Sequence, residues 1–108
     1  MAGTSRTGAS YRFRVSDALD VPLRGRLLRL RLLDGNPSMK ELAKGRKLTL
    51  TAPDGERREV TIMSHGVTGG RATQQRLEAT RELDIMVAAE DAGSGEDAID
   101  IGWIATGA

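Results

Sequence analysis

Apolar and polar residues alternate with a period of two in several short stretches, and this pattern limits the fold more than any other feature. The first stretch begins at Tyr11, where Arg12 and Arg14 alternate with apolar residues up to Val15. Successive side chains of a β-strand point to opposite faces, so this stretch predicts a strand with one apolar and one basic face. Further stretches of this kind follow at close spacing, which is typical of an all-β domain.

A second strand is expected over residues 23–33, before a turn at residues 34–37. Arg24 and Arg26 share one phase of the alternation between the two faces of the strand. Arg29 and Arg31 have the opposite phase. A change of phase within one strand predicts a β-bulge near residues 27–28 or a sharp bend of the strand.

A β-hairpin is the clearest local prediction. Leucine and threonine alternate over residues 48–52, and Val60 and Ile62 continue the apolar pattern on the return strand. Between them, Pro53-Asp54-Gly55 supplies a fixed φ, a turn-forming side chain and a residue that is free to adopt positive φ.

The remaining segments complete an all-β pattern. Further strands are expected over residues 82–89 and 98–105, separated by a flexible segment at residues 91–96. Residues 65–75 contain three glycines and are expected to form a loop, which residues 76–80 extend as a short strand or turn. Residues 38–41 have the spacing of a capping box, which predicts one helical turn or an ordered loop.

Together these segments predict one domain, a small closed β-barrel of six to seven strands over residues 11–106. Residues 1–10 have no periodicity and are expected to form a disordered N-terminal tail. The 108 residues include no cysteine, no apolar run long enough for a membrane span and no apolar segment typical of a signal peptide. We therefore expect a cytoplasmic protein without disulfides and without a membrane partner.

The net charge of +1 conceals an uneven distribution. Residues 1–47 carry 11 basic and 4 acidic residues, or +7, whereas residues 48–108 carry 5 basic and 11 acidic residues, or −6. This difference predicts a dipolar surface if the two halves occupy different regions. If strands from the two halves alternate in the sheet, their charges instead neutralise one another.

The candidate motifs for chemistry are weak. Residues 3–10 have the glycine spacing of a phosphate-binding loop but carry Ala9 in place of the lysine, with no strand before them, so no bound nucleotide is expected. His65 is the only histidine and is expected to be partly buried and hydrogen-bonded rather than a metal ligand. We expect solvated charges rather than acid–base groups at three aspartates, Asp84, Asp97 and Asp100. Trp103 is expected to lie in the core with Ile99 and Ile101, whose phase it shares. We expect no enzyme activity, no metal and no cofactor.

Five short motifs occur in order along the chain: Phe13-x-Val15-x-Asp17, Val21-Pro22-x-Arg24-Gly25, Gly45-x-x-Leu48-x-Leu50, Ile62-Met63-x-His65 and Gly102-x-Ile104-Ala105. Their order and spacing resemble the second domain of the translational GTPases, the β-barrel of elongation factor Tu and its relatives. The resemblance covers nearly all of residues 11–106, although Arg29-Leu30 stands where the family usually has a Thr-Gly pair. It implies a translation-factor barrel, here as a stand-alone module. In that family the barrel helps to position RNA acceptor ends or contacts ribosomal RNA.

The basic strands carry the candidate site. If the first two strands are neighbours, they present one basic face, and guanidinium groups suit the geometry of phosphates. The candidate nucleic-acid-binding residues are Arg12, Arg14, Arg24 and Arg26. The sequence therefore predicts a non-catalytic binding module for RNA or a ribosome-like polyanion. The alternative is a protein–protein interaction adaptor, with no nucleic-acid role, that docks a partner on its acidic C-terminal half or on an exposed edge strand.

Overall fold

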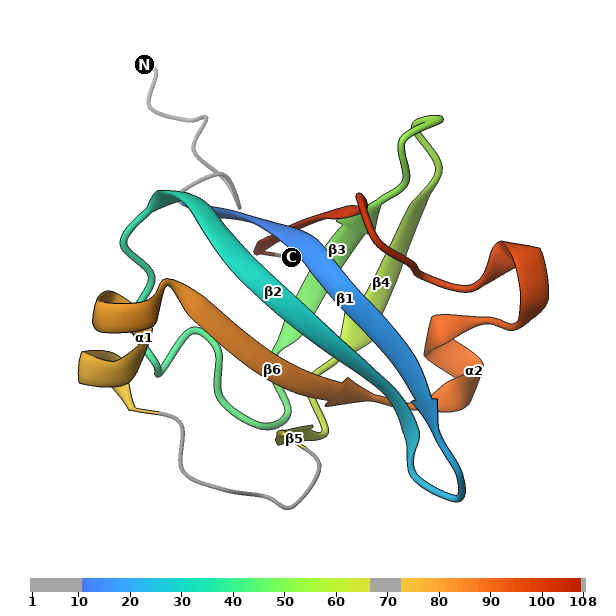
Figure 1. Ribbon diagram of the computed structural model, residues 1–108, viewed down its shortest axis with the longest axis horizontal. Helices are drawn as coiled ribbons and strands as arrows, with labels where there is room; N and C mark the ends of the chain where they lie inside the picture. Colours follow the sequence, from blue (N-terminus) through green and yellow to red (C-terminus); the bar gives the residue numbers. More distant parts are fainter. Residues whose placement is uncertain (1–10, 67–72, 108) are drawn as a thin grey trace.

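The computed structural model describes residues 11–66 and 73–107, which form mostly antiparallel β-structure (Figure 1). The predicted tail and part of the predicted 65–75 loop lie outside these residues. In chain order the elements are β1 (Tyr11–Val21), β2 (Gly25–Gly35), β3 (Lys47–Thr51), β4 (Arg57–Thr61), β5 (Ser64–His65), α1 (Gln74–Thr80), β6 (Glu82–Val87), α2 (Ala89–Ala92), the 3-10 helix η2 (Gly95–Asp97) and β7 (Ile104–Gly107).

All seven strands belong to one sheet, in the order β4-β3-β7-β1-β2-β6-β5, and every neighbouring pair is antiparallel. The all-β prediction is confirmed. The predicted closed barrel of six to seven strands is wrong, because no ladder of hydrogen bonds joins the edge strands β4 and β5 within the described residues. The physical reason is that the link between β4 and β5 makes no hairpin turn: Ile62 N–H bonds the Arg46 carbonyl on the β3 side and Met63 N–H bonds the Met86 carbonyl of β6.

The sheet is nevertheless strongly curled. Seven strands laid flat would place their two edges about 29 Å apart. Thr61 at the end of β4 and Ser64 at the start of β5 are separated by only three peptide steps, which span at most about 11 Å. The link between them is held in place, since Ile62 N–H donates to the Arg46 carbonyl at 2.9 Å and Met63 N–H to the Met86 carbonyl at 2.8 Å.

The core lies inside this curl and is mainly aliphatic. Alternate residues of each strand point inward and are buried, as their period of two predicts. They include Phe13, Val15, Leu28, Leu30, Leu48, Leu50, Val60, Leu83, Ile85 and Val87. The predicted hairpin is confirmed, with β3 pairing β4 in the register Leu48↔Val60, and Gly55 has a φ of +97°.

The predicted bulge near residues 27–28 is misplaced. The register of β1 against β2 shifts between Arg12 and Phe13 and again between Val15 and Asp17. Strand β2 alternates regularly between its inner and outer faces over residues 26–31, and Arg26 is on the same inner face as Leu28. Arg26 thus lies at the end of the inner face, where a charged side chain can reach the rim of the core.

Two other segments differ from the sequence-based prediction. Residues 74–80 form the helix α1, because the Thr73 hydroxyl accepts a hydrogen bond from Arg76 N–H and caps its first turn. Residues 98–103 are not a strand, and β7 begins only at Ile104. The predicted capping box is confirmed, with Ser38 N–H donating to the Glu41 carboxylate at 2.9 Å.

The predicted flexible segment at residues 91–96 is instead fastened to the sheet. It contains parts of α2 and η2, and Arg58 Nη1 donates to the carbonyls of Ala92 and Asp97, both at 2.8 Å. The Arg58 guanidinium also lies 5.2 Å from the centre of the Trp103 ring, a cation–π contact. Trp103 is buried as predicted, but its neighbour Ile101 is 53% exposed and lies outside the core.

Gly93→Ala is expected to destabilise the protein more than Gly55→Ala. Both glycines have positive φ, but a Cβ on Gly93 would lie 2.6 Å from Arg58 Nη1, whereas a Cβ on Gly55 meets no atom within 4 Å. The displaced Arg58 would lose hydrogen bonds worth about 1–3 kcal/mol. The free energy of unfolding in urea measures the difference. Equal losses for the two variants would show that Arg58 does not hold this segment.

The free energy of unfolding is expected to fall as the pH rises above about 10, because burial raises the pKa of Tyr11 above its ordinary value. As the pH rises, the tyrosine ionises in the unfolded chain before it ionises in the folded protein. Its contribution to the free energy of unfolding is therefore complete below about pH 10 and is lost as the pH passes through the folded-state pKa. Tyr11 is the only tyrosine, so tyrosinate absorbance reports its ionisation directly. In Tyr11→Phe this part of the pH dependence should be absent; an unchanged profile would contradict the assignment.

Candidate interaction surface

The four predicted site arginines do not form one face. Strands β1 and β2 are indeed neighbours, but Arg12 and Arg14 lie at the start of β1, whereas Arg24 and Arg26 lie at the other end of the hairpin. Arg26 pairs with Asp20, which is eight residues from Arg12, or about 26 Å along the strand. The two pairs of arginines could therefore not contact the same short stretch of phosphates.

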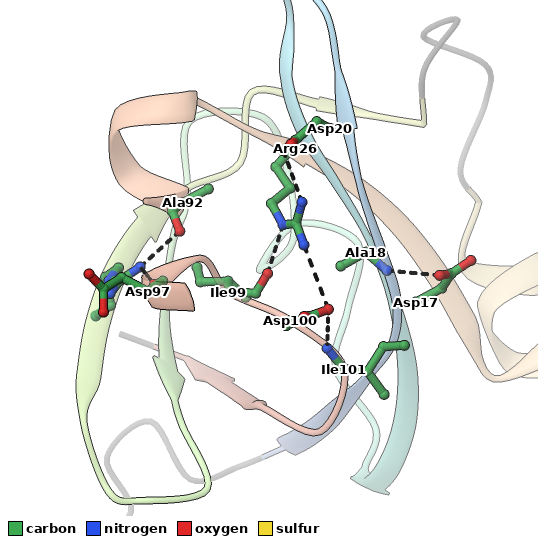
Figure 2. Close-up of polar contacts among 10 residues, drawn as sticks. Asp17, Ala18, Asp20, Arg26, Ala92, Asp97, Ile99, Asp100 and Ile101 are labelled. Atoms are coloured by element: carbon green, nitrogen blue, oxygen red, sulfur yellow. Dashed lines mark hydrogen bonds and ion pairs between the residues drawn. The ribbon is translucent and has the colours of Figure 1, made fainter. Parts of the chain in front are cut away.

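Arg26 serves the structure rather than the surface. Its side chain is only 12% exposed, and its Nε donates to the Ile99 carbonyl at 2.7 Å. Its terminal nitrogens lie 2.9 Å from Asp20 and 3.6 Å from Asp100 (Figure 2). The guanidinium therefore joins the far end of the β1–β2 hairpin to the segment that follows η2.

The outer face of β1, β2 and β6 has mixed charge. Arg12 pairs with Asp34 at 3.1 Å, Arg31 with Glu82 at 3.7 Å, and Arg29 with Asp84 through two hydrogen bonds of 2.9 and 3.2 Å. The hydrogen bond to Asp84 is also the main reason why the pKa of Arg29 is raised. On this face, strands from the basic and acidic halves of the chain neutralise one another.

Of the remaining two candidates, Arg14 is exposed beside Arg31, and its side chain makes no hydrogen bond or ion pair with the described residues. Arg24 is exposed at the turn between β1 and β2. Whether any of the four arginines contacts nucleic acid stays a prediction.

The end of the β1–β2 hairpin carries apolar side chains that sequence reasoning missed. Leu23 is fully exposed and Leu19 is 45% exposed. Leu23 follows Pro22 in the turn and has a φ of +67°, a conformation that usually requires glycine or asparagine. A leucine in this position costs stability through backbone strain, and its exposed side chain gains nothing from burial in return. The Pro-Leu pair in a turn is the sequence signal that could have identified it.

The edge of β1 near this turn has no strand beside it. On the side away from β2, β7 pairs with residues 12–14 only, and Val15 makes the last hydrogen bonds, to Gly102 and Trp103. From Asp17 to Val21 no described strand pairs with this edge. Ala18 N–H is satisfied locally by the Asp17 carboxylate at 3.0 Å.

Acidic side chains lie on and beside this edge. Asp17 and Asp20 belong to the edge itself, and Asp100 reaches it through its ion pair with Arg26. Asp20 and Asp100 both contact Arg26, so one positive charge faces two negative charges there. Because Arg26 comes from the basic half of the chain and Asp100 from the acidic half, the two halves also meet at this end, which lies opposite α1 in the molecule (Figure 1).

The other candidate residues do not assemble a chemical site. His65 is half-buried and donates from Nε2 to the Leu42 carbonyl at 2.7 Å, in agreement with the predicted structural role. Asp84 and Asp100 pair with different arginines, while Asp97 is exposed. Within residues 11–66 and 73–107, no group of three acidic or histidine side chains could hold a metal ion. Among the helices described, none has the length and apolar character that a membrane crossing needs.

No known protein family, curated protein or solved structure matches this chain. The resemblance to the second domain of the translational GTPases therefore stays a prediction.

Arg26→Met is expected to lower the free energy of unfolding by about 1–3 kcal/mol, because the buried Ile99 carbonyl and the two aspartates lose their partner. Arg12→Met is the matched control, since it removes an exposed ion pair worth at most about 1 kcal/mol. Urea unfolding of both variants measures the contrast. A smaller loss for Arg26→Met than for the control would contradict the structural role of Arg26.

Proposed function

We propose that this chain is a non-catalytic interaction adaptor that docks a partner protein on the end of its β1–β2 hairpin. The observation that carries the proposal is the combination of exposed Leu19 and Leu23 with an unpaired strand edge from Asp17 to Val21. Exposed apolar side chains that gather in one part of the surface are typical of sites that a partner covers. Unpaired edges, in turn, are places where an extended chain can add to a sheet.

The RNA-binding alternative receives less support from the same contacts. Arg12 is engaged by Asp34, and Arg26 is enclosed among Ile99, Asp20 and Asp100. Aromatic side chains that could stack on bases are also scarce, since Tyr11, Phe13 and Trp103 are all buried. A cytoplasmic location is part of the proposal, because the chain has no cysteine and an adaptor without disulfides suits a reducing compartment.

Selection of displayed random peptides on the immobilised chain tests the proposal. Enriched peptides should lose at least about tenfold in affinity for Leu23→Ser, because a central apolar contact is commonly worth more than 1 kcal/mol. Leu33→Ser is the matched control, since Leu33 is 41% exposed in β2 far from the hairpin turn. Failure to enrich any peptide, or equal loss for the two variants, would contradict the adaptor.

A salt titration with single-stranded RNA tests the alternative. If the adaptor proposal is right, Arg12 and Arg14 do not contribute to RNA binding. Replacing both with glutamine should then leave any salt-dependent binding of RNA unchanged. Binding whose log K–log salt slope becomes shallower by about 1.4 in this double variant would favour the polyanion-binding module instead.

A further inference from the structure

We infer that the partner contributes an extended segment with alternating basic and apolar residues, which adds as a strand to the free edge of β1 over Asp17–Val21. This inference rests on the proposed function and names both the chemistry of the partner and its mode of binding.

The backbone of β1 supplies the first argument. Strand β2 occupies one side of β1 down to the pair Val21↔Gly25. Ala18 N–H bonds the Asp17 carboxylate rather than a carbonyl of β2, so it points toward the free edge. Because backbone groups alternate in direction along a strand, those of Asp20 point to the same edge. The carboxylate of Asp17 occupies the place where a carbonyl of an added strand would accept this hydrogen bond.

The free edge has a defined length. At one end, Gly102 and Trp103 form backbone hydrogen bonds with Val15, so a partner strand cannot extend beyond this point. At the other end the Val21-Pro22-Leu23 turn closes the hairpin, with Arg24 N–H donating to the Val21 carbonyl at 3.0 Å. Five residues of β1 lie between these limits, which matches the usual length of a strand.

The two faces of β1 determine which side chains the partner needs. Leu19 lies on the outer face opposite Leu27, which is half-buried, so an added strand would bring apolar side chains against this pair. Asp20 and Asp100 lie on the other side, with exposed fractions of 82% and 63%, and share the single charge of Arg26. Lysine or arginine at alternate positions of the partner would neutralise the remaining negative charge.

Charge also argues against a second copy of this chain as the occupant. Two β1 edges brought together would place Asp17 and Asp20 of one copy beside the same aspartates of the other. Like charges on neighbouring strands are destabilising, and acidic side chains on an edge discourage this kind of pairing. A basic partner segment meets no such repulsion.

A seven-residue capped peptide of alternating lysine and valine, added to the isotopically labelled full chain, tests the inference by NMR. We expect saturable shifts of the Ala18 and Asp20 amide signals. Two matched peptides are N-methylated on alternate backbone nitrogens, one on the odd and one on the even positions, and both keep every side chain. The peptide methylated on the nitrogens that face β1 cannot form the strand ladder, and it should bind at least about tenfold more weakly than the other. A peptide with glutamate in place of lysine should not bind, and Asp100→Asn should weaken the lysine peptide.

The outcomes separate this inference from the proposed function. If both N-methylated peptides bind as tightly as the unmodified peptide, strand addition is wrong, even if displayed peptides still require Leu23. Absence of binding by the lysine peptide also overturns the inference, while the display selection decides the adaptor independently. Sedimentation of the Asp17→Asn variant gives a further check. If this variant self-associates and the unaltered chain binds no peptide, the aspartates only keep copies of the chain apart, and the inference is wrong.

Discussion

The two-residue link between β4 and β5 is the constraint on which the rest of the structure depends. These strands form the opposite edges of the sheet, yet Ile62 and Met63 are all that separates them in the chain. The sheet can satisfy both pairings only by curling until its edges come close together. The curl encloses the inward side chains, so a chain with three aromatic residues still obtains a continuous core from leucine, isoleucine and valine.

A curled sheet leaves the ends of its inner face open, and two arginines cover one of these ends. Arg26 and Arg58 both have inward phase, and both donate to carbonyls of the segment from Ala92 to Ile99. Because guanidinium groups offer several donors in one plane, each can bond more than one carbonyl or carboxylate while its aliphatic part packs against the core. Arg58 thereby holds the start of this segment against β4, and Arg26 holds its end against the β1–β2 hairpin.

The hairpin end combines features that stability alone would not favour. Leu23 combines positive φ with full exposure, and the edge of β1 keeps backbone groups without a strand partner. An aspartate satisfies one backbone N–H on each of two edges, Ala18 N–H on β1 and Thr61 N–H on β4. Exposed Leu23 in the adjoining turn distinguishes the β1 edge, and it is the physical basis for placing the interaction surface there.

The sequence by itself determined the class of fold, most of the strands and the β3–β4 hairpin, because a period of two and a Pro-Asp-Gly turn are local properties. It also placed Trp103 and the inward leucines correctly. It could not determine that the sheet stays open, since this depends on which distant strands become neighbours. Nor could it predict the environment of each arginine. Arg14 is exposed, Arg29 pairs with an aspartate on a neighbouring strand, and Arg26 is largely buried. Only the tertiary structure decides which carbonyls and carboxylates each guanidinium reaches, and therefore which charges remain available to a partner.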